Sequence, residues 1–280
     1  MEPSVPRETS CYHISKLGKV IAVTNQKGGV GKTTTAINLA ASLAVSDIRV
    51  LVIDSDPQGN ATTGLGISKD PNRPSLYNVL LGHSELRDAI VKGDLEGLDI
   101  VPADKNLVGA NLELVDIPNR EKRLHRKIEA VKADYGYILI DCPPALDLLT
   151  LNALLAADSV LIPIQCEFFA LEGISELIAT IDRIRETLQH PLQIEGIVLT
   201  MYDDRTNLTR QVAADLKEFF GKDVLHTVIP RSVRLAEAPS HGKPILTYDV
   251  RSRGAESYIQ LAKEILDRDH ATRKSAQSIG

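Results

Sequence analysis

A glycine-rich segment between an apolar run and a helical pattern constrains the fold of this chain more than any other feature. Residues 20–24 read VIAVT, residues 25–32 read NQKGGVGK, and a helical pattern follows over residues 33–44. A strand, a glycine-rich loop and a helix in this order form a phosphate-binding loop. The glycines let backbone N–H groups turn toward a phosphate, and the helix N-terminus adds its positive dipole end. The segment therefore predicts a nucleoside triphosphate site.

The loop departs from the usual template, G-x-x-x-x-G-K-[ST]. Gln26 stands at the first glycine position, and an additional lysine, Lys27, lies five residues before Lys32. We expect Lys32 to bind the β- and γ-phosphate oxygens and the Thr33 hydroxyl to bind Mg²⁺. The alternative is a solvated Lys27 and a Lys32 that is only a helix-start charge, which leaves the coincidence of glycines, lysines and threonines unexplained. The predicted loop contacts to the nucleotide are Lys27, Gly28, Gly29, Val30, Gly31, Lys32, Thr33 and Thr34.

Three aspartates stand at or just beyond the ends of apolar, strand-like runs. Asp54 ends the run 50–54 with Asp56 two residues later, and Asp141 ends the run 137–141. Ligands of open parallel sheets bind beyond the carboxyl ends of the strands, so all three should face the phosphate loop. We expect Asp141 to be linked to Mg²⁺ and Asp56 to orient or activate the attacking water. The alternative roles are a helix cap for Asp141 and a turn-former for Asp56.

Strand-like and helical patterns alternate along almost the whole chain. This alternation predicts an α/β fold with a doubly wound, mostly parallel sheet and helices on both faces, as in P-loop NTPases. The expected strands are 20–24, 50–54, 98–102, 137–141, 159–164, 194–200 and 227–229, and the expected helices include 33–44, 120–133, 171–188, 208–220 and 255–266. No repeat or linker divides the chain, so we expect one ATPase domain over 18–268, a flexible tail at 1–17 and a polar tail at 269–280.

Composition narrows the class of protein further. The formal net charge is −5, yet residues 225–254 hold five basic and two acidic residues, so a local basic surface is possible in an acidic chain. Aromatic residues make up 4% with no Trp, which disfavours a stacking platform for single-stranded nucleic acid. No apolar run reaches the roughly 18 residues of a membrane span and no signal peptide precedes the loop, which predicts a cytoplasmic protein.

Four motifs in order resemble the ParA/Soj partitioning ATPases of the ParA/MinD group. They are KGGVGKTT at 27–34, DSDPQGNATTGLG at 54–66, DCPP at 141–144 and VIPRSVRLAEAP at 228–239, and the likeness runs from about residue 19 to 266. The resemblance implies an ATP-hydrolysing enzyme that uses ATP and Mg²⁺ and drives chromosome or plasmid segregation. It also implies an ATP-dependent homodimer, nucleoid association through sequence-independent double-stranded DNA binding, and hydrolysis stimulated by a ParB-like centromere-binding partner.

The resemblance also implies roles for single residues. Lys27 reaches the partner's nucleotide across the dimer, so Lys27, Lys32 and Asp56 form the expected catalytic set. The residues expected near the metal are Thr33, Asp56 and Asp141. Pro230 and Ser232 are the expected adenine contacts, although relatives usually carry Asn where this chain has Ser232. The expected DNA-binding residues are Arg205, Arg234, Lys243, Arg251 and Arg253. Without the resemblance, each of these arginines would be interpreted as a solvated or ion-paired surface residue.

Three other classes of protein share parts of this pattern. A MinD-like positioning ATPase shares both lysines but ends in an amphipathic membrane helix, whereas residues 267–280 show no apolar face. An iron–sulfur carrier needs paired cysteines, and Cys11, Cys142 and Cys166 lie far apart with no C-x-x-C spacing. A P-loop phosphotransferase or ligase needs an acceptor pocket that the sequence does not reveal. The short segment before Gln26 also predicts no N-terminal helix-turn-helix.

Overall fold

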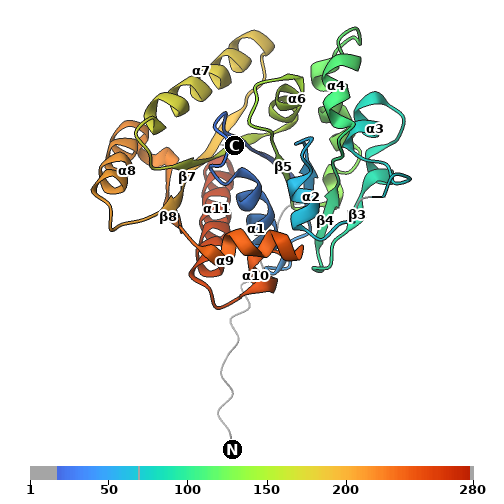
Figure 1. Cartoon of the computed structure of the whole chain (residues 1–280). Helices are drawn as coiled ribbons and strands as arrows, with labels where there is room; N and C mark the ends of the chain where they lie inside the picture. Colours follow the sequence, from blue (N-terminus) through green and yellow to red (C-terminus); the bar gives the residue numbers. More distant parts are fainter. Residues whose placement is uncertain (1–17, 69, 278–280) are drawn as a thin grey trace, which may run out of the picture.

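The computed structural model describes residues 18–68 and 70–277 and contains one eight-stranded sheet (Figure 1). The strand order is β3-β4-β2-β5-β1-β6-β7-β8, and every pairing except β3–β4 is parallel. The strands are β1 Lys19–Val23, β2 Val50–Asp54, β3 Val91–Lys92, β4 Leu98–Val101, β5 Tyr137–Asp141, β6 Ser159–Gln165, β7 Gln193–Tyr202 and β8 Val224–Pro230. All seven predicted strands are present, and the doubly wound prediction is confirmed. The expected tail at 1–17 lies outside the described residues.

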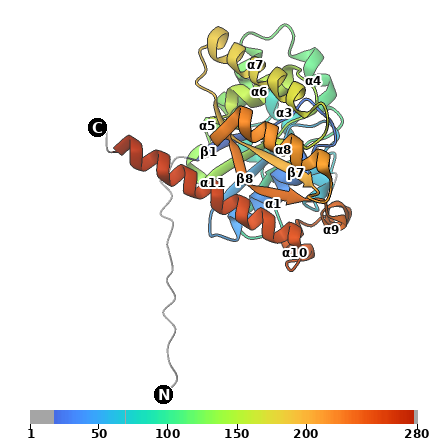
Figure 2. The same ribbon diagram turned by 90° about the vertical axis from the view of Figure 1, so that its left-hand side faces the viewer.

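Helices cover both faces of the sheet, because alternate residues of the central strands enter different cores. In β1, Ile21 and Val23 belong to one core, and Val20 and Ala22 to the other. The first core contains α1 Lys32–Ala44, α9 Val233–Glu237, α10 Ile245–Tyr248 and α11 Arg253–Gln277. The second contains α3 Leu76–Leu81, α4 Leu107–Glu113, α5 Arg123–Glu129, α6 Leu148–Ala156, α7 Ala170–Leu188 and α8 Asn207–Phe220. Figure 2 shows α11 on the opposite side of the sheet from α6 and α7.

Several elements differ from the sequence prediction. The expected helix 120–133 is divided into η2 Arg120–Lys122, α5 and η3 Lys132–Asp134. The helix α6 was not predicted, because its sequence LLTLNALLA is apolar on nearly every side and shows no helical periodicity. Its start is fixed by Asp147, whose carboxylate accepts a hydrogen bond from the Thr150 N–H at 3.1 Å. The short elements α2 Asn60–Gly64, η1 Leu86–Ala89, η4 Gly221–Asp223 and η5 Ala238–His241 complete the fold.

The parallel register brings the ends of β1, β2 and β5 to one edge of the sheet. Asp141 of β5 lies opposite Asp54 of β2 on one side and Val23 of β1 on the other. The chain beyond Val23 continues into the glycine-rich loop. The phosphate loop and two of the aspartates therefore meet at this edge, as the sequence predicts.

The last helix corrects the predicted polar tail. Helix α11 continues from Arg253 to Gln277, so residues 269–277 are helical, while residues 278–280 lie outside the described residues. The reason is a polar network at the edge of the sheet opposite the loop. Asp269 on α11 accepts hydrogen bonds from Lys19 Nζ of β1 and Tyr137 Oη of β5, and Lys19 also pairs with Glu195 of β7. Asp269 thus attaches α11 to β1 and β5, and Lys19 links this site to β7.

Removing the carboxylate of Asp269 tests this attachment. We expect Asp269→Ala to lower the free energy of unfolding by about 1–3 kcal/mol, because Lys19 and Tyr137 lose a partner in a partly buried site. Asp267→Ala removes an exposed carboxylate from the same helix, with no ion pair among the described residues, and should change it by less than about 0.5 kcal/mol. The measurement is urea unfolding followed by circular dichroism, and equal effects of both variants would refute the attachment.

Candidate functional site

The glycine-rich loop joins β1 to α1 with two residues in left-handed backbone conformation. Gly29 has φ +75° and Gly31 φ +88°, a region that other residues adopt only with strain. Gly31 directly precedes α1, whose first turn has no side-chain cap and no acidic residue. A Cβ built on Gly28 or Gly29 would meet no atom within 4 Å, so this side of the loop is open to a ligand. The loop can present its own N–H groups and those of α1 to an anion.

Two side-chain contacts hold this loop in place, one to β6 and one from β7. Asn25 donates from Nδ2 to the Pro163 carbonyl of β6 at 2.8 Å and accepts the Lys27 N–H on its Oδ1 at 2.9 Å. Thr200 of β7 donates its hydroxyl to the Val30 carbonyl at 2.8 Å. Sequence analysis did not identify Asn25 or Thr200 as site residues. The available signal was a polar residue at the end of an otherwise apolar strand.

Lys32 lies nearly buried at the start of α1. Its Nζ donates to the Lys27 carbonyl across the loop at 3.0 Å, which places the ammonium over the loop. Burial lowers the pKa of Lys32, and this effect is opposed mainly by Asp141, with Cys142 and Asp56 contributing. The structure thus brings the predicted lysine close to two of the predicted carboxylates. Lys27 instead lies half exposed and forms an ion pair with Glu167 of its own chain.

Asp54 has a structural role at this edge of the sheet. Its Oδ2 accepts two hydrogen bonds of 2.7 Å, from the N–H and from the hydroxyl of Thr62, and its Oδ1 accepts the Asp56 N–H at 3.2 Å. Burial raises the pKa of Asp54 to about 6, although these hydrogen bonds act in the opposite direction. Asp54 therefore holds the segment that carries Asp56.

Asp141 is the carboxylate best suited to a cation. It is fully buried, and neither oxygen accepts a well-formed hydrogen bond among the described residues. Burial raises its pKa well above the ordinary range and the nearby Asp54 raises it further, whereas the Thr33 hydroxyl lowers it. An unsatisfied carboxylate beside a threonine hydroxyl is an oxygen set of the kind that Mg²⁺ prefers.

Asp56 lies beside this pair, almost buried, on the loop after β2. Its Oδ1 accepts the Gln58 N–H at 2.9 Å, which makes a tight turn before α2. Within the described residues, no group of three or more His, Cys, Asp or Glu side chains is placed to hold a metal. A cation at Asp141 would therefore need phosphate oxygens and the Thr33 hydroxyl to complete its ligands. The residues present fit Mg²⁺ together with a nucleotide.

A cavity of about 350 Å³ adjoins the loop on the side of β7 and β8. Gly31 and Thr34 of the loop and of α1 line it, together with the predicted adenine contacts Pro230 and Ser232. Sequence analysis missed the other lining residues, which are Thr200, Met201, Ile229, Arg231, Val233, Leu235, Ala236 and Tyr258. Met201 has φ +48°, which is unusual for a residue with a side chain, and the register between β7 and β8 shifts between Leu199 and Tyr202. The cavity is mostly apolar and can hold a flat ring next to the phosphate loop.

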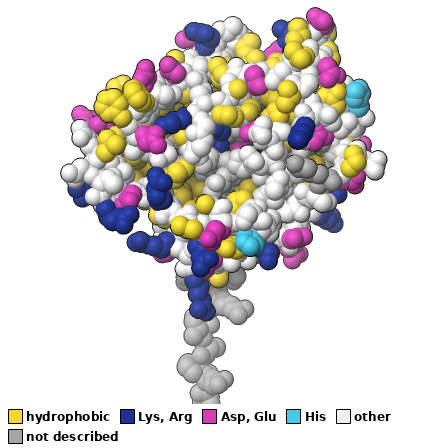
Figure 3. Space-filling model, in the orientation of Figure 1, with side chains coloured by type: hydrophobic (Ala, Val, Ile, Leu, Met, Phe, Trp, Pro, Cys, Tyr) yellow, Lys and Arg dark blue, Asp and Glu magenta, His cyan; other side chains and the backbone are white. Residues whose placement is uncertain are grey.

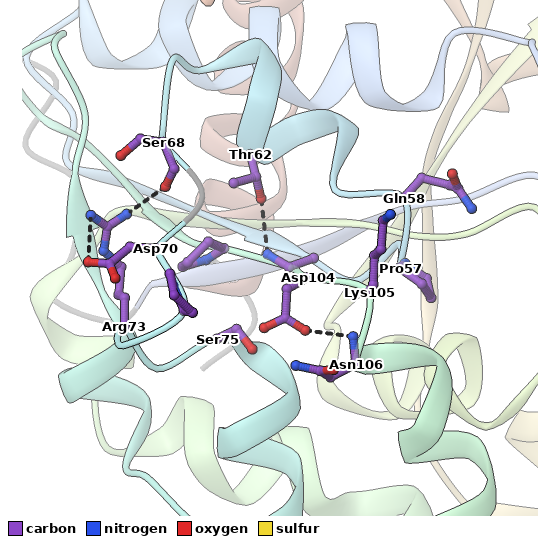
Figure 4. A pocket seen from close by; sticks show the side chains of 13 residues that line it. Pro57, Gln58, Thr62, Ser68, Asp70, Arg73, Ser75, Asp104, Lys105 and Asn106 are labelled. Atoms are coloured by element: carbon purple, nitrogen blue, oxygen red, sulfur yellow. Dashed lines mark hydrogen bonds and ion pairs between the residues drawn. The ribbon is translucent and has the colours of Figure 1, made fainter.

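A second cavity, of about 260 Å³, lies on the other side of the Asp56 segment (Figure 4). Pro57 and Gln58 border it, and the Thr62 hydroxyl accepts the Ala103 N–H at 3.0 Å beside it. Across the cavity, Asp104 accepts the Asn106 N–H on its Oδ1 at 2.8 Å. The segment after Asp56 therefore borders this second cavity, and the hydrogen bonds between Asp54 and Thr62 hold it in place.

The predicted DNA-binding residues lie on the surface near β8, α9 and the start of α11. Dark blue side chains gather there, toward the lower left of Figure 3. Arg205 forms two hydrogen bonds to Asp203, which lower the pKa of that carboxyl to about 2, and Arg234 pairs with Glu237 and Asp249. The remaining predicted residues are exposed and have no ion pair among the described residues: Lys243, Arg251 and Arg253.

The parallel sheet, the glycine loop and the buried lysine and carboxylates define a P-loop protein of the nucleoside-triphosphate-binding class. A family model described as an AAA domain matches residues 18–194. The sporulation initiation inhibitor protein Soj of Bacillus subtilis is 56% identical over 249 residues, 89% of this chain and 98% of that protein. The chromosome partitioning protein ParA of Caulobacter vibrioides is 53% identical over 253 residues, 90% of this chain and 95% of that protein.

A solved structure is similar over most of the same region. It is the cobyrinic acid a,c-diamide synthase of Mycobacterium smegmatis with a bound ATP analogue and magnesium, with a TM-score of 0.77 and 37% identity. The match covers 88% of this chain and 93% of that chain. The identity to Soj and ParA over nearly their whole length shows that the chain belongs to the ParA/Soj family of chromosome-partitioning proteins. The resemblance seen in the motifs is thereby confirmed.

The buried charge of Asp141 generates a prediction about pH. The pKa of Asp141 is higher in the folded than in the unfolded chain, so the folded chain binds the carboxyl proton more tightly. The free energy of unfolding therefore falls as the pH rises from about 4, the pKa of an unfolded aspartate, through the folded pKa. Nucleotide-free Asp141→Asn should therefore be more stable than the wild type at pH 8, by about 1–3 kcal/mol, with the gain shrinking toward pH 4. Urea unfolding across this range, without Mg²⁺, measures it.

The matched control is Asp267→Asn, which neutralises an exposed carboxylate and should show no pH-dependent gain. A destabilised Asp141→Asn protein at pH 8 would mean that the carboxylate already has a stabilising partner.

Proposed function

We propose that this protein is a Mg²⁺-dependent ATPase that drives chromosome or plasmid segregation. The observation that carries the proposal is the buried, unsatisfied carboxylate of Asp141 beside Lys32 and an uncapped glycine-loop helix, in a chain 56% identical to Soj. The loop supplies N–H donors for phosphates, and the adjoining apolar cavity accepts the base between Pro230, Ser232 and Gly31. The M. smegmatis structure with an ATP analogue and magnesium supports this ligand pair.

Each polar residue of the site has a separate task in this proposal. Lys32 binds the β- and γ-phosphate oxygens. The cation lies on the side of Thr33, Asp141 and Asp56. Mg²⁺, held by Thr33 and Asp141, would neutralise negative charge on the phosphates. Asp56 orients the attacking water in this proposal, because it lies on the loop after β2, close to both Lys32 and Asp141. Phosphoryl transfer depends mainly on the positioning of charged groups, so a site that lacks one of these groups hydrolyses ATP slowly.

Nucleotide state is coupled to DNA through dimerisation in this proposal. Lys27 reaches the nucleotide of a second copy, and the dimer aligns two weak basic surfaces on double-stranded DNA of any sequence. The backbones of Gly66 and Gly242 approach closely, since a Cβ on Gly66 would lie 2.8 Å from the Gly242 carbonyl oxygen. This contact joins the segment after Asp56 to the basic region around Lys243. Stimulation by a ParB-like partner and residence on the nucleoid are further parts of the proposal, supported by the membership of the ParA/Soj family.

The high identity to Soj and ParA favours this proposal over the alternative, a MinD-like positioning ATPase. None of the described helices is long and apolar enough to cross a membrane. The proposed domain, residues 18–268, contains every residue proposed to bind nucleotide, metal or DNA.

Two variants test the ATPase directly. Asp56→Ala should bind ATP, lose at least about 100-fold in turnover and accumulate as a dimer, because the group that positions the water is lost while Lys32, Thr33 and Asp141 remain. Lys32→Ala should fail to bind ATP at all, since a desolvated charge contact to phosphate is lost. Turnover is measured by phosphate release and dimerisation by light scattering after size exclusion. Wild-type turnover in Asp56→Ala, or normal ATP affinity in Lys32→Ala, would contradict the assigned roles.

A salt titration tests the DNA surface. With ATP, wild-type protein should bind duplex DNA without sequence preference, and log affinity should fall with log salt at about −0.9 per neutralised phosphate. Arg205→Glu or Arg234→Glu should weaken DNA binding and flatten this slope by about two, because a dimer presents each arginine twice. Arg183→Glu makes the same charge change on an exposed part of α7 and is the matched control. Equal affinity with ATP and ADP would contradict the coupling.

A further inference from the structure

The second lysine of the loop is paired within its own chain. Lys27 Nζ donates to Glu167 Oε2, and both side chains remain accessible, at 51% and 41% exposure. Glu167 is 140 residues away in sequence and follows β6, which pairs with β1 in parallel. The two chain segments that leave the carboxyl ends of these strands therefore lie side by side, and the ion pair joins them.

The segment that carries Glu167 is a surface element. Phe168 and Phe169, the next two residues, are 77% and 66% exposed and form an edge-to-face pair with ring centroids 5.1 Å apart. Helix α7 begins immediately afterwards, at Ala170. Exposed neighbouring aromatic side chains next to an exposed ion pair are typical of a surface that another protein covers.

We propose that Glu167 is a positioning residue that holds Lys27 in cis and so sets the threshold for ATP-dependent association of two chains. The inference rests on the proposed function, in which Lys27 acts on the nucleotide of a second copy. A single ammonium cannot keep its pair with Glu167 and also occupy the phosphates of a partner. The Glu167 carboxylate would also repel those phosphates, so the pair must separate when two chains associate.

The size of this effect follows from the exposure of the pair. An accessible ion pair contributes a factor of about 1.4 to 5 to an equilibrium constant, and it weakens with salt. Two such pairs separate in each dimer, so Glu167 should raise the dimer dissociation constant by about 2- to 30-fold. The chain thus carries a weak restraint on Lys27, which ATP binding on both sides overcomes.

The first measurement tests the pair itself in nucleotide-free protein. Lysine acetylation followed by peptide mass spectrometry gives the rate at Lys27 relative to Lys243, an exposed lysine with no ion pair among the described residues. In Glu167→Gln, this ratio should rise by about 1.4- to 5-fold. Glu172→Gln removes an exposed carboxylate from the first turn of α7, with no ion pair among the described residues, and should leave the ratio unchanged. Equal ratios in both variants overturn the proposal.

The second measurement tests the consequence. Sedimentation velocity over a range of protein concentrations, with Mg²⁺ and a non-hydrolysable ATP analogue, should give Glu167→Gln a dimer dissociation constant about 2- to 30-fold below that of the wild type. The difference should shrink as salt is raised, and Glu172→Gln should match the wild type. Faster acetylation of Lys27 with an unchanged dissociation constant overturns the threshold role. A wild type that forms no dimer with the analogue contradicts the proposed function, while the acetylation result still decides whether the pair exists.

Discussion

The parallel register of β1, β2 and β5 is the constraint on which the rest of the site depends. It ends three strands at one edge of the sheet, so that Asp54 and Asp141 lie opposite each other and the glycine loop leaves β1 beside them. Two carboxylates in this position cost free energy unless each is compensated. Asp54 is compensated by Thr62, whereas Asp141 is left for a cation. The fold thus leaves the buried carboxyl group of Asp141 without a well-formed hydrogen bond from the described residues at the place where the nucleotide is proposed to bind.

Much of this edge could be predicted from the sequence, because its signals are local. The order of strand, glycine loop and helix fixes where Lys32 and Thr33 lie, and an aspartate at the end of an apolar strand predicts Asp141. The contacts that hold these residues could not be predicted, since they cross between strands distant in sequence. Thr200 reaches Val30 from β7, 170 residues away, and Asn25 reaches Pro163, 138 residues away. The hydrophobic periodicity of a sequence contains no information about such pairs.

The differences from prediction have physical causes of the same kind. The two-residue strand β3 is too short for an alternating pattern, and α6 is too uniformly apolar for a helical one. The polar sequence at the end of α11 predicts a tail, because the contacts of Asp269 with Lys19 and Tyr137 are not visible in the sequence. The DNA-binding role of the arginines stays a prediction. Arg205 and Arg234 are already paired in cis, so their charge becomes available to DNA only if those pairs exchange.

Calorimetric titration of ATP into nucleotide-free protein, with Mg²⁺ and then with a chelator, tests the central claim most directly. If Asp141, Thr33 and the glycine loop form one site, ATP should bind once per chain and the affinity should fall sharply when Mg²⁺ is removed, because the buried carboxylate then faces the phosphates without a cation. Binding of equal strength with and without Mg²⁺ would contradict the account, since Asp141 would then have no part in holding the nucleotide.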